Sequence, residues 1–196
     1  MSTTTTPTPP YWTLSPISQY IRRLHPTTHS PQPQPAHQPV DHFWLNLLRH
    51  YFPLSAEFAI TWDGPGYEVM NIRQDALHKL IFVEAMQFPP NVAPGWQDTH
   101  HWDCVLAGVG MRMRRAREIF GAVQTVYGIV AVGDRVRFYC MPVANNPDGG
   151  LMSFVGGVEG LVSSESRMLS IHGDREGVHR VLEAMSWEAR SGDNDY

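Results

Sequence analysis

The segment that most constrains the fold is a run of nine residues, Lys79-Leu-Ile-Phe-Val-Glu-Ala-Met-Gln87, in which apolar side chains follow one another almost without a break. A half-exposed strand alternates apolar and polar residues, whereas a continuous apolar run is typical of a strand buried on both faces. Such a strand belongs in the centre of a sheet that helices flank. The one acidic residue inside the run, Glu84, is therefore a carboxylate placed within or beside a core.

The elements around this strand define its surroundings. Helices are predicted over residues 41–52, 103–120 and from 174 onward, and strands over 58–62, 67–72, 126–132, 135–141 and 167–172. The pair Gly133-Asp134 between two of these strands is typical of a two-residue hairpin turn. The order predicts a single α/β or α+β domain of about 150 residues with a mixed central sheet flanked by helices.

Composition divides the chain into three parts. Residues 1–39 are rich in Pro, Thr and Ser and are predicted to form a flexible arm, residues 40–189 the folded domain, and residues 190–196 a polar tail. One stretch of the arm departs from this pattern, because Ser15-Pro16 precedes apolar residues at helical spacing up to Leu24. That short helix either belongs to the arm or docks on the domain or on a partner.

Charge and cysteine content narrow the class of protein. The chain has a net charge of −4, and its basic residues are 14 arginines and one lysine, Lys79. Its two cysteines, Cys104 and Cys140, are predicted to be buried thiols, since two are too few for a disulfide framework. No secretory signal and no membrane-spanning run is seen, so we expect an intracellular protein, cytoplasmic or nuclear, that is neither secreted nor membrane-bound.

Two acidic residues stand at a spacing that carries a family resemblance. Glu68 follows Pro65 at the start of one predicted strand, and Glu84-Ala85-Met86 lies sixteen residues later on the next. With the helix that follows and the Val126–Met141 hairpin, this arrangement resembles the PD-(D/E)XK, or restriction-endonuclease-like, nuclease superfamily over residues 40–189. The resemblance implies a restriction-endonuclease-like fold, with Glu68 and Glu84 as ligands of Mg²⁺ and position 86 as the place of a catalytic lysine.

The chemistry of such a site shows why the departure at position 86 matters. Two carboxylates on neighbouring strands can share Mg²⁺, which polarises a phosphodiester and activates water, and an adjacent lysine stabilises the developing charge. Here Met86 stands at the lysine position, and regular strand alternation places Lys79 on the opposite face from Glu84. We therefore expect the fold without an intact hydrolytic site, and no cofactor.

Three functions remain open. The first is a catalytically impaired nuclease-like module that binds a protein or, weakly, a nucleic acid. The second is a Mg²⁺-dependent nuclease that uses Glu68 and Glu84. The third is an α+β scaffold or small-molecule-binding protein, unrelated to nucleases, in which Glu84 is a structural carboxylate and Glu68 a solvated charge.

One basic cluster is a candidate binding surface. Arg112, Arg114, Arg115 and Arg117 fall in the second half of the helix predicted over 103–120 and could contact nucleic acid or an acidic partner. They could equally form a solvated helix end. Residues 41–196 hold 13 basic and 19 acidic residues, a net charge of −6, which argues against strong nucleic-acid binding. A protein partner is expected, a homodimer is compatible with the sequence, and the partner's identity is left open.

Overall fold

The computed structural model describes residues 9–24, 38–64, 66–73, 75–89, 92–143, 151–154 and 167–191. The helices are η1 (Tyr11–Thr13), α1 (Ser15–Ile21), α2 (Gln38–Tyr51), η2 (Leu54–Ala56), α3 (Trp96–Thr99), α4 (Trp102–Phe120) and α5 (Arg175–Ser191). The strands are β1 (Ala59–Asp63), β2 (Gly66–Arg73), β3 (Ala76–Met86), β4 (Val126–Val132), β5 (Arg135–Met141), β6 (Met152–Ser153) and β7 (Leu169–Ser170).

Within the described residues the strands form one mixed sheet. The sheet has seven strands. Six of them follow the order β1-β2-β3-β4-β5-β6, and the seventh, β7, pairs with β5 beside this path. The pairs β1–β2, β2–β3 and β4–β5 are antiparallel, whereas β4 runs parallel to β3. A parallel neighbour needs a crossover connection, and α4 lies in the segment that makes it. The predicted mixed α/β class, with a central sheet flanked by helices, is confirmed.

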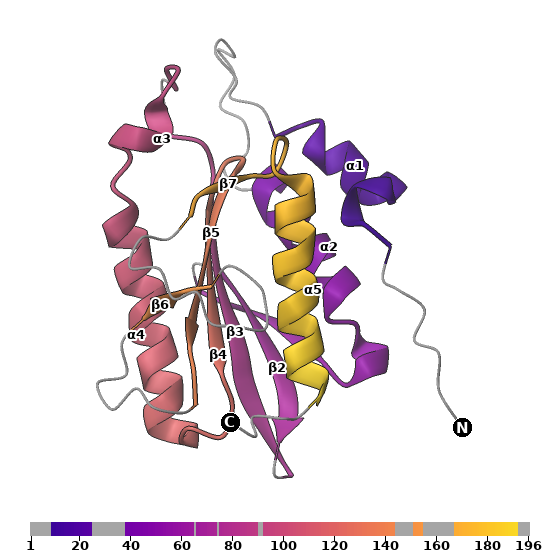
Figure 1. Ribbon diagram of the computed structural model, residues 1–196, viewed down its shortest axis with the longest axis vertical. Coiled ribbons are helices and arrows are strands. Elements are labelled where there is room, and N and C mark those ends of the chain that lie inside the picture. The colour runs from indigo at the N-terminus through magenta and orange to yellow at the C-terminus, as the bar shows by residue number, and fades with distance from the viewer. Residues whose placement is uncertain are drawn as a thin grey trace.

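Helices cover both faces of the sheet, with α4 on one side and α1, α2 and α5 on the other (Figure 1). Along β3 the side chains separate accordingly, because Ile81 and Val83 join the core under α2 and α5 while Phe82 joins the core under α4. The predicted burial of this strand on both faces is confirmed. All residues of its neighbour β4 are buried as well.

Glycine at two positions of the β4–β5 hairpin has a steric reason. A Cβ on Gly128 would lie 2.8 Å from atoms of Val109 and Met113, so its absence lets α4 approach the sheet. Gly133 has a φ of +56° in the turn that joins β4 to β5, a backbone conformation that favours glycine. The two-residue Gly133-Asp134 turn predicted from the sequence is confirmed.

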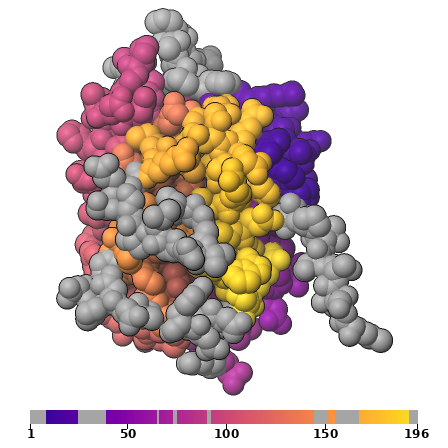
Figure 2. All heavy atoms as spheres, viewed as in Figure 1, coloured from indigo at the N-terminus to yellow at the C-terminus, as the bar shows by residue number. Residues whose placement is uncertain are grey.

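The expectation of a flexible arm over residues 1–39 is wrong for residues 9–24, which pack on the domain. Tyr11 and Leu24 are fully buried, and they join the core under α2 and α5. The hydroxyl of Tyr11 donates to the carbonyl of Ile171, and Trp12 packs edge-on against the His179 ring. Figure 2 shows this segment, in indigo, beside α5, in yellow. A few large apolar side chains suffice to order it, because burying each is worth roughly 1.5–3 kcal/mol. The rest of the expected arm before α2 lies outside the described residues.

The C-terminal part differs from the prediction in its boundaries. The last helix, α5, extends through Ser191, so residues 190 and 191 belong to it rather than to a polar tail. The guanidinium of Arg190 donates to the carbonyl of Tyr51. Residues 192–196 lie outside the described residues. The strand expected over 167–172 is limited to Leu169–Ser170.

Candidate functional site

Glu68 and Glu84 lie on neighbouring strands and on the same face of the sheet. In the antiparallel pairing of β2 with β3, Glu68 is opposite Phe82 and Glu84 is opposite Gly66. Opposite residues share a face, and every second residue of a strand returns to it. Diagonal neighbours of this kind are about 7–8 Å apart. Because Phe82 belongs to the core under α4, both carboxylates lie on the α4 side of the sheet.

Glu68 is a buried carboxylate with two cationic partners. Its side chain is only 3% exposed. The Nζ of Lys79 lies 2.7 Å from its Oε2, and the Nη2 of Arg112 lies 3.5 Å from its Oε1. The same Nζ is 3.6 Å from Oδ2 of Asp63, an exposed residue at the end of β1. A buried carboxylate is tolerated when cations compensate its lost hydration, and here the chain itself supplies two.

Lys79 reaches this site because of an irregularity in β3. Val69 pairs with Ile81, but its neighbour Met70 pairs with Lys79, so β3 carries one extra residue, Leu80, at that point. A one-residue shift reverses the face of every side chain beyond it. The expectation that Lys79 lies on the opposite face from Glu84 is therefore wrong. Nothing in the local sequence marks the bulge, since Leu80 continues the apolar run.

Glu84 occupies a different environment from Glu68. It is half-buried, and burial raises the pKa of its carboxyl above the usual value, while the nearby Arg112 guanidinium acts in the opposite direction. Two glycines adjoin it: Gly66 is its strand partner, and a Cβ on Gly108 of α4 would lie 3.1 Å from its Oε2. The carboxyl group thus fills space that a side chain at position 108 would occupy, whereas a Cβ on Gly66 would meet the β3 backbone at Val83.

Arg112 connects the two carboxylates. It follows Gly108 by one helical turn, forms the ion pair with Glu68, and interacts electrostatically with Glu84. Its guanidinium carbon lies 5.3 Å from the centre of the ring of Phe82, which is opposite Glu68 and two residues before Glu84. The guanidinium of Arg112 is therefore a positive charge that acts on both carboxylates. The helical spacing of Gly108 and Arg112 was a signal that could have indicated this arrangement.

The position at which the resemblance places a lysine carries no charge. Met86 is the last residue of β3 and pairs with Val132, whose side chain belongs to the core under α4. Strand alternation therefore places Met86 on the same face as Glu84, where it is partly exposed. A thioether there can neither orient water as an ammonium does nor stabilise developing negative charge.

The four arginines of α4 do not form one surface. Arg112 turns inward to Glu68, and Arg117 donates to the carbonyl of Met141. Burial lowers the pKa of the Arg117 guanidinium. Arg114 and Arg115 are exposed. A binding surface on this helix would therefore be built from two arginines and not from four.

A cleft of about 300 Å³ lies over Glu68, between the sheet and the second half of α4. It is lined by Asp63, Glu68, Lys79, Phe82, Arg112, Arg115, Ala116, Ile119 and Phe120. Glu84 is not among these residues. The cleft thus exposes the Lys79 side of the Glu68 cluster to solvent.

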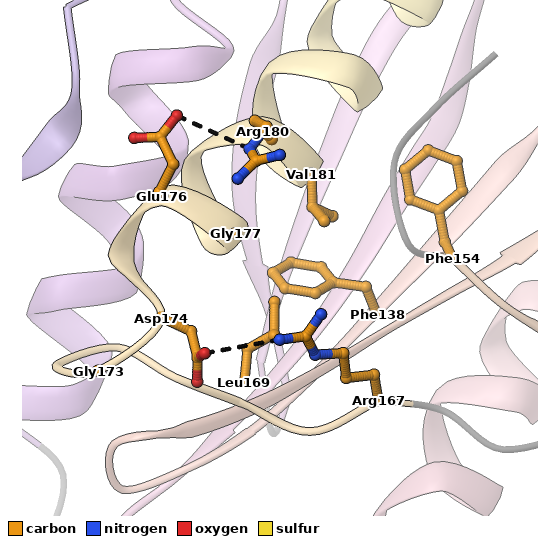
Figure 3. A pocket seen from close by; sticks show the side chains of 10 residues that line it. All are labelled: Phe138, Phe154, Arg167, Leu169, Gly173, Asp174, Glu176, Gly177, Arg180 and Val181. Atoms are coloured by element: carbon orange, nitrogen blue, oxygen red, sulfur yellow. Dashed lines mark ion pairs between the residues drawn. The ribbon is translucent and has the colours of Figure 1, made fainter.

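Another cavity, of about 340 Å³, lies at the start of α5 (Figure 3). Its floor is apolar, with Phe138 and Leu169, and its rim carries two ion pairs. Arg167 lies 3.8 Å from Asp174, and Arg180 lies 3.7 Å from Glu176 on the helix. Each arginine is thus paired with a carboxylate, and none of the predicted site residues contributes to this cavity.

The segment before α4 holds no metal cluster among the described residues. No group of three or more His, Cys, Asp or Glu is placed to hold an ion in that part of the chain. His100 packs edge-on against both Trp96 and Trp102, whose rings stack on each other. Cys104 is exposed rather than buried as expected, whereas Cys140 is buried.

Comparison with protein-family models, with curated proteins and with solved structures finds no match to this chain. In the part of the chain that the structure describes, no helix combines the length and the apolar character needed to cross a membrane. The fold and site define a mixed α/β protein in which two carboxylates on adjacent strands face a helix, whose Arg112 forms an ion pair with one of them and acts electrostatically on the other.

Proposed function

We propose that this protein is a catalytically impaired, nuclease-like interaction module with a restriction-endonuclease-like fold, which binds a protein or, weakly, a nucleic acid. The observation that carries the proposal is the position of Arg112, which forms an ion pair with Glu68 and acts electrostatically on Glu84, because it places a fixed monovalent cation near both acids, where a hydrolytic site would hold Mg²⁺. The neutral Met86 adds to it, since it leaves the lysine position of the resemblance without a charge.

The order of elements supports the nuclease-like part of this proposal. A helix (α2), an antiparallel meander (β1 to β3), a crossing helix (α4) and a strand parallel to β3 follow one another as in the resemblance. The two acids fall on the second and third strands of the meander. This correspondence covers topology and site position together.

The electrostatics support the loss of catalysis. Mg²⁺ would have to separate Glu68 from Arg112 and Lys79, although that carboxylate is almost completely buried. Displacing the partner of a buried charge costs about 3–5 kcal/mol. Glu84, the second ligand, has a raised pKa and so holds its proton more readily than an ordinary glutamate. Both effects weaken divalent-cation binding.

The test combines metal titration with cleavage. The purified chain is titrated with Mn²⁺ by calorimetry and incubated with labelled single- and double-stranded DNA and RNA in Mg²⁺ or Mn²⁺. We expect neither metal binding nor cleavage by the wild type. Arg112→Ala, which removes the guanidinium near both carboxylates and leaves Lys79 as the partner of Glu68, is expected to gain Mn²⁺ binding, whereas Arg114→Ala, at an exposed position of the same helix, is not. Metal binding by the wild type equal to that of Arg112→Ala would contradict the proposal.

A metal-dependent phosphodiesterase that uses Glu68 and Glu84 is the second candidate, and the position of Lys79 favours it. The ammonium group expected two residues after Glu84 is instead supplied five residues before it, 2.7 Å from Glu68. This function predicts Mn²⁺-dependent cleavage by the wild type that Glu84→Ala and Lys79→Met both abolish. Met86→Leu, which preserves the apolar character at the degenerate position, should then retain cleavage.

A further inference from the structure

The cleft over Glu68 continues into a surface on the α4 side of the sheet that carries exposed apolar side chains. Ile72 and Leu77 are opposite each other in β2 and β3 and are 54% and 49% exposed. Ile119 of α4 is 62% exposed and lines the cleft. With the charged residues Asp63 and Arg115 of the cleft walls, these side chains are called the open face below.

This surface is uncovered because α4 lies over the middle of the sheet. The core under α4 takes its strand residues from β3, β4 and β5, and among the described residues none comes from β1 or β2. Ile72 lies four residues along β2 from Glu68, an even number, and therefore faces the α4 side. Exposed apolar residues that gather on one face, with charges beside them, are typical of a protein contact surface.

The two walls of the cleft carry complementary groups in the same order. Gly108 adjoins Glu84, and Ile119 lines the cleft with Lys79, so α4 runs antiparallel to β3. Along this direction the helix wall presents Arg115 and then Ile119. The sheet wall presents Asp63, in the row of Glu84, and then the Ile72–Leu77 pair near the β2–β3 turn.

Such an arrangement is self-complementary under a two-fold rotation. A two-fold axis that runs along the cleft brings the sheet wall of one copy against the helix wall of the other. Asp63 then meets the second copy's Arg115, and Ile119 meets the second copy's Ile72 and Leu77. The first contact pairs opposite charges and the second pairs apolar side chains. The two-fold axis repeats each contact, so each occurs twice in the dimer.

We infer that the open face is the contact between two copies of this chain in a two-fold symmetric dimer. The inference is independent of whether the cleft hydrolyses phosphodiesters, because it concerns the rim of the cleft and not its buried carboxylates. It assigns to the exposed Arg115, to which the described residues provide no ion pair, a partner on the second copy.

The test is sedimentation velocity of the full chain over a range of micromolar concentrations. We expect a species of twice the 22.2 kDa chain mass that dissociates on dilution. Asp63→Arg and Arg115→Asp each bring like charges together and should raise the dissociation constant at least about tenfold. The double variant Asp63→Arg/Arg115→Asp reverses both charges and should restore it to within about threefold.

Two further variants distinguish a dimer formed through the open face from one formed through a different surface. Ile119→Asp places a carboxylate in the apolar part and should abolish the dimer, whereas Leu54→Asp, an exposed apolar residue of η2, should leave it unchanged. Circular dichroism spectra and melting curves establish that each variant is folded. A wild type that stays monomeric at every concentration overturns the inference. So does a dimer that resists Ile119→Asp, or single charge reversals that the double variant does not rescue.

Discussion

The Nζ of Lys79 lies 2.7 Å from the Oε2 of Glu68, although the two residues are not opposite each other in the sheet. Lys79 pairs with Met70, and its side chain extends along the sheet to the buried carboxylate. The contact exists because β3 carries one extra residue at Leu80. It shows that the only lysine of the chain neutralises the acid at the first site position.

Removing this lysine should destabilise the fold. Lys79→Met leaves Glu68 with Arg112 as its one cationic partner, so the free energy of unfolding should fall by about 1–3 kcal/mol. Urea denaturation followed by circular dichroism measures it. Adding Glu68→Gln removes the carboxylate charge that has lost its lysine partner, so the double variant should be less destabilised than the two single losses combined. Additive losses would show that the ion pair contributes nothing, and exposed Arg114→Met serves as the control.

The stability of the protein should depend on the protonation of Glu84. Because the pKa of Glu84 in the folded protein is raised above 4.5, the folded state binds the proton more tightly than the unfolded chain. Stability contributed by this group is present at low pH and is lost as pH rises from the unfolded pKa through the folded one. Glu84→Gln, which cannot ionise, should therefore gain stability relative to the wild type over the pH range above 4.5.

Urea denaturation of both proteins across this range gives the measurement. Met86→Leu, on the same face but without a titrating group, should follow the wild-type curve. A stability difference between Glu84→Gln and the wild type that stays constant with pH, or that shrinks as pH rises, would contradict the raised pKa.

Gly108 should be coupled energetically to Glu84. Alanine is favoured over glycine within a helix by about 1 kcal/mol. In the wild type the added Cβ would lie 3.1 Å from the Oε2 of Glu84, so part of this gain should be lost. In the Glu84→Ala background the contact is absent, and Gly108→Ala should stabilise by the full amount. Thermal melts of the four proteins measure the difference, and equal effects in both backgrounds would refute the contact.

The N-terminal segment should contribute to the stability of the domain. Tyr11 is completely buried, so Tyr11→Ala should cost about 3–5 kcal/mol, the usual range for large aromatic residues in a core. Trp187→Ala, at an exposed aromatic residue of α5, should change stability by less than about 0.5 kcal/mol. Chemical denaturation compares the two. If both substitutions lowered the free energy of unfolding by equally small amounts, residues 9–24 would be a flexible arm after all.

Several parts of the fold could be predicted because their signals are local. The apolar run around Ile81 and Phe82 indicated a strand buried on both faces, and the structure separates these two side chains into two cores. Gly133-Asp134 indicated a two-residue turn because glycine tolerates the required backbone conformation. Strand alternation placed Glu84 and Met86 on one face, as the pairing with β4 has them.

The environment of the site could not be predicted in the same way. Whether Glu84 is joined to Glu68 through a metal ion or through Arg112 depends on how α4 crosses the sheet, and no local pattern specifies that crossing. The docking of residues 9–24 on the domain could not be predicted either, because the high proline content of the N-terminal part indicated an arm. Their packing against Ile171 and His179 depends on a groove formed by distant parts of the chain.

The sequence by itself determined the order of the elements, the buried central strand and the acids at positions 68 and 84, because each depends on residues close together in the chain. Only the tertiary structure decided which charges meet. One extra residue in β3 moves Lys79 to the other face, and the packing of α4 brings Arg112 to Glu68. Both depend on register and on long-range packing, which the periodicity of a single segment does not encode.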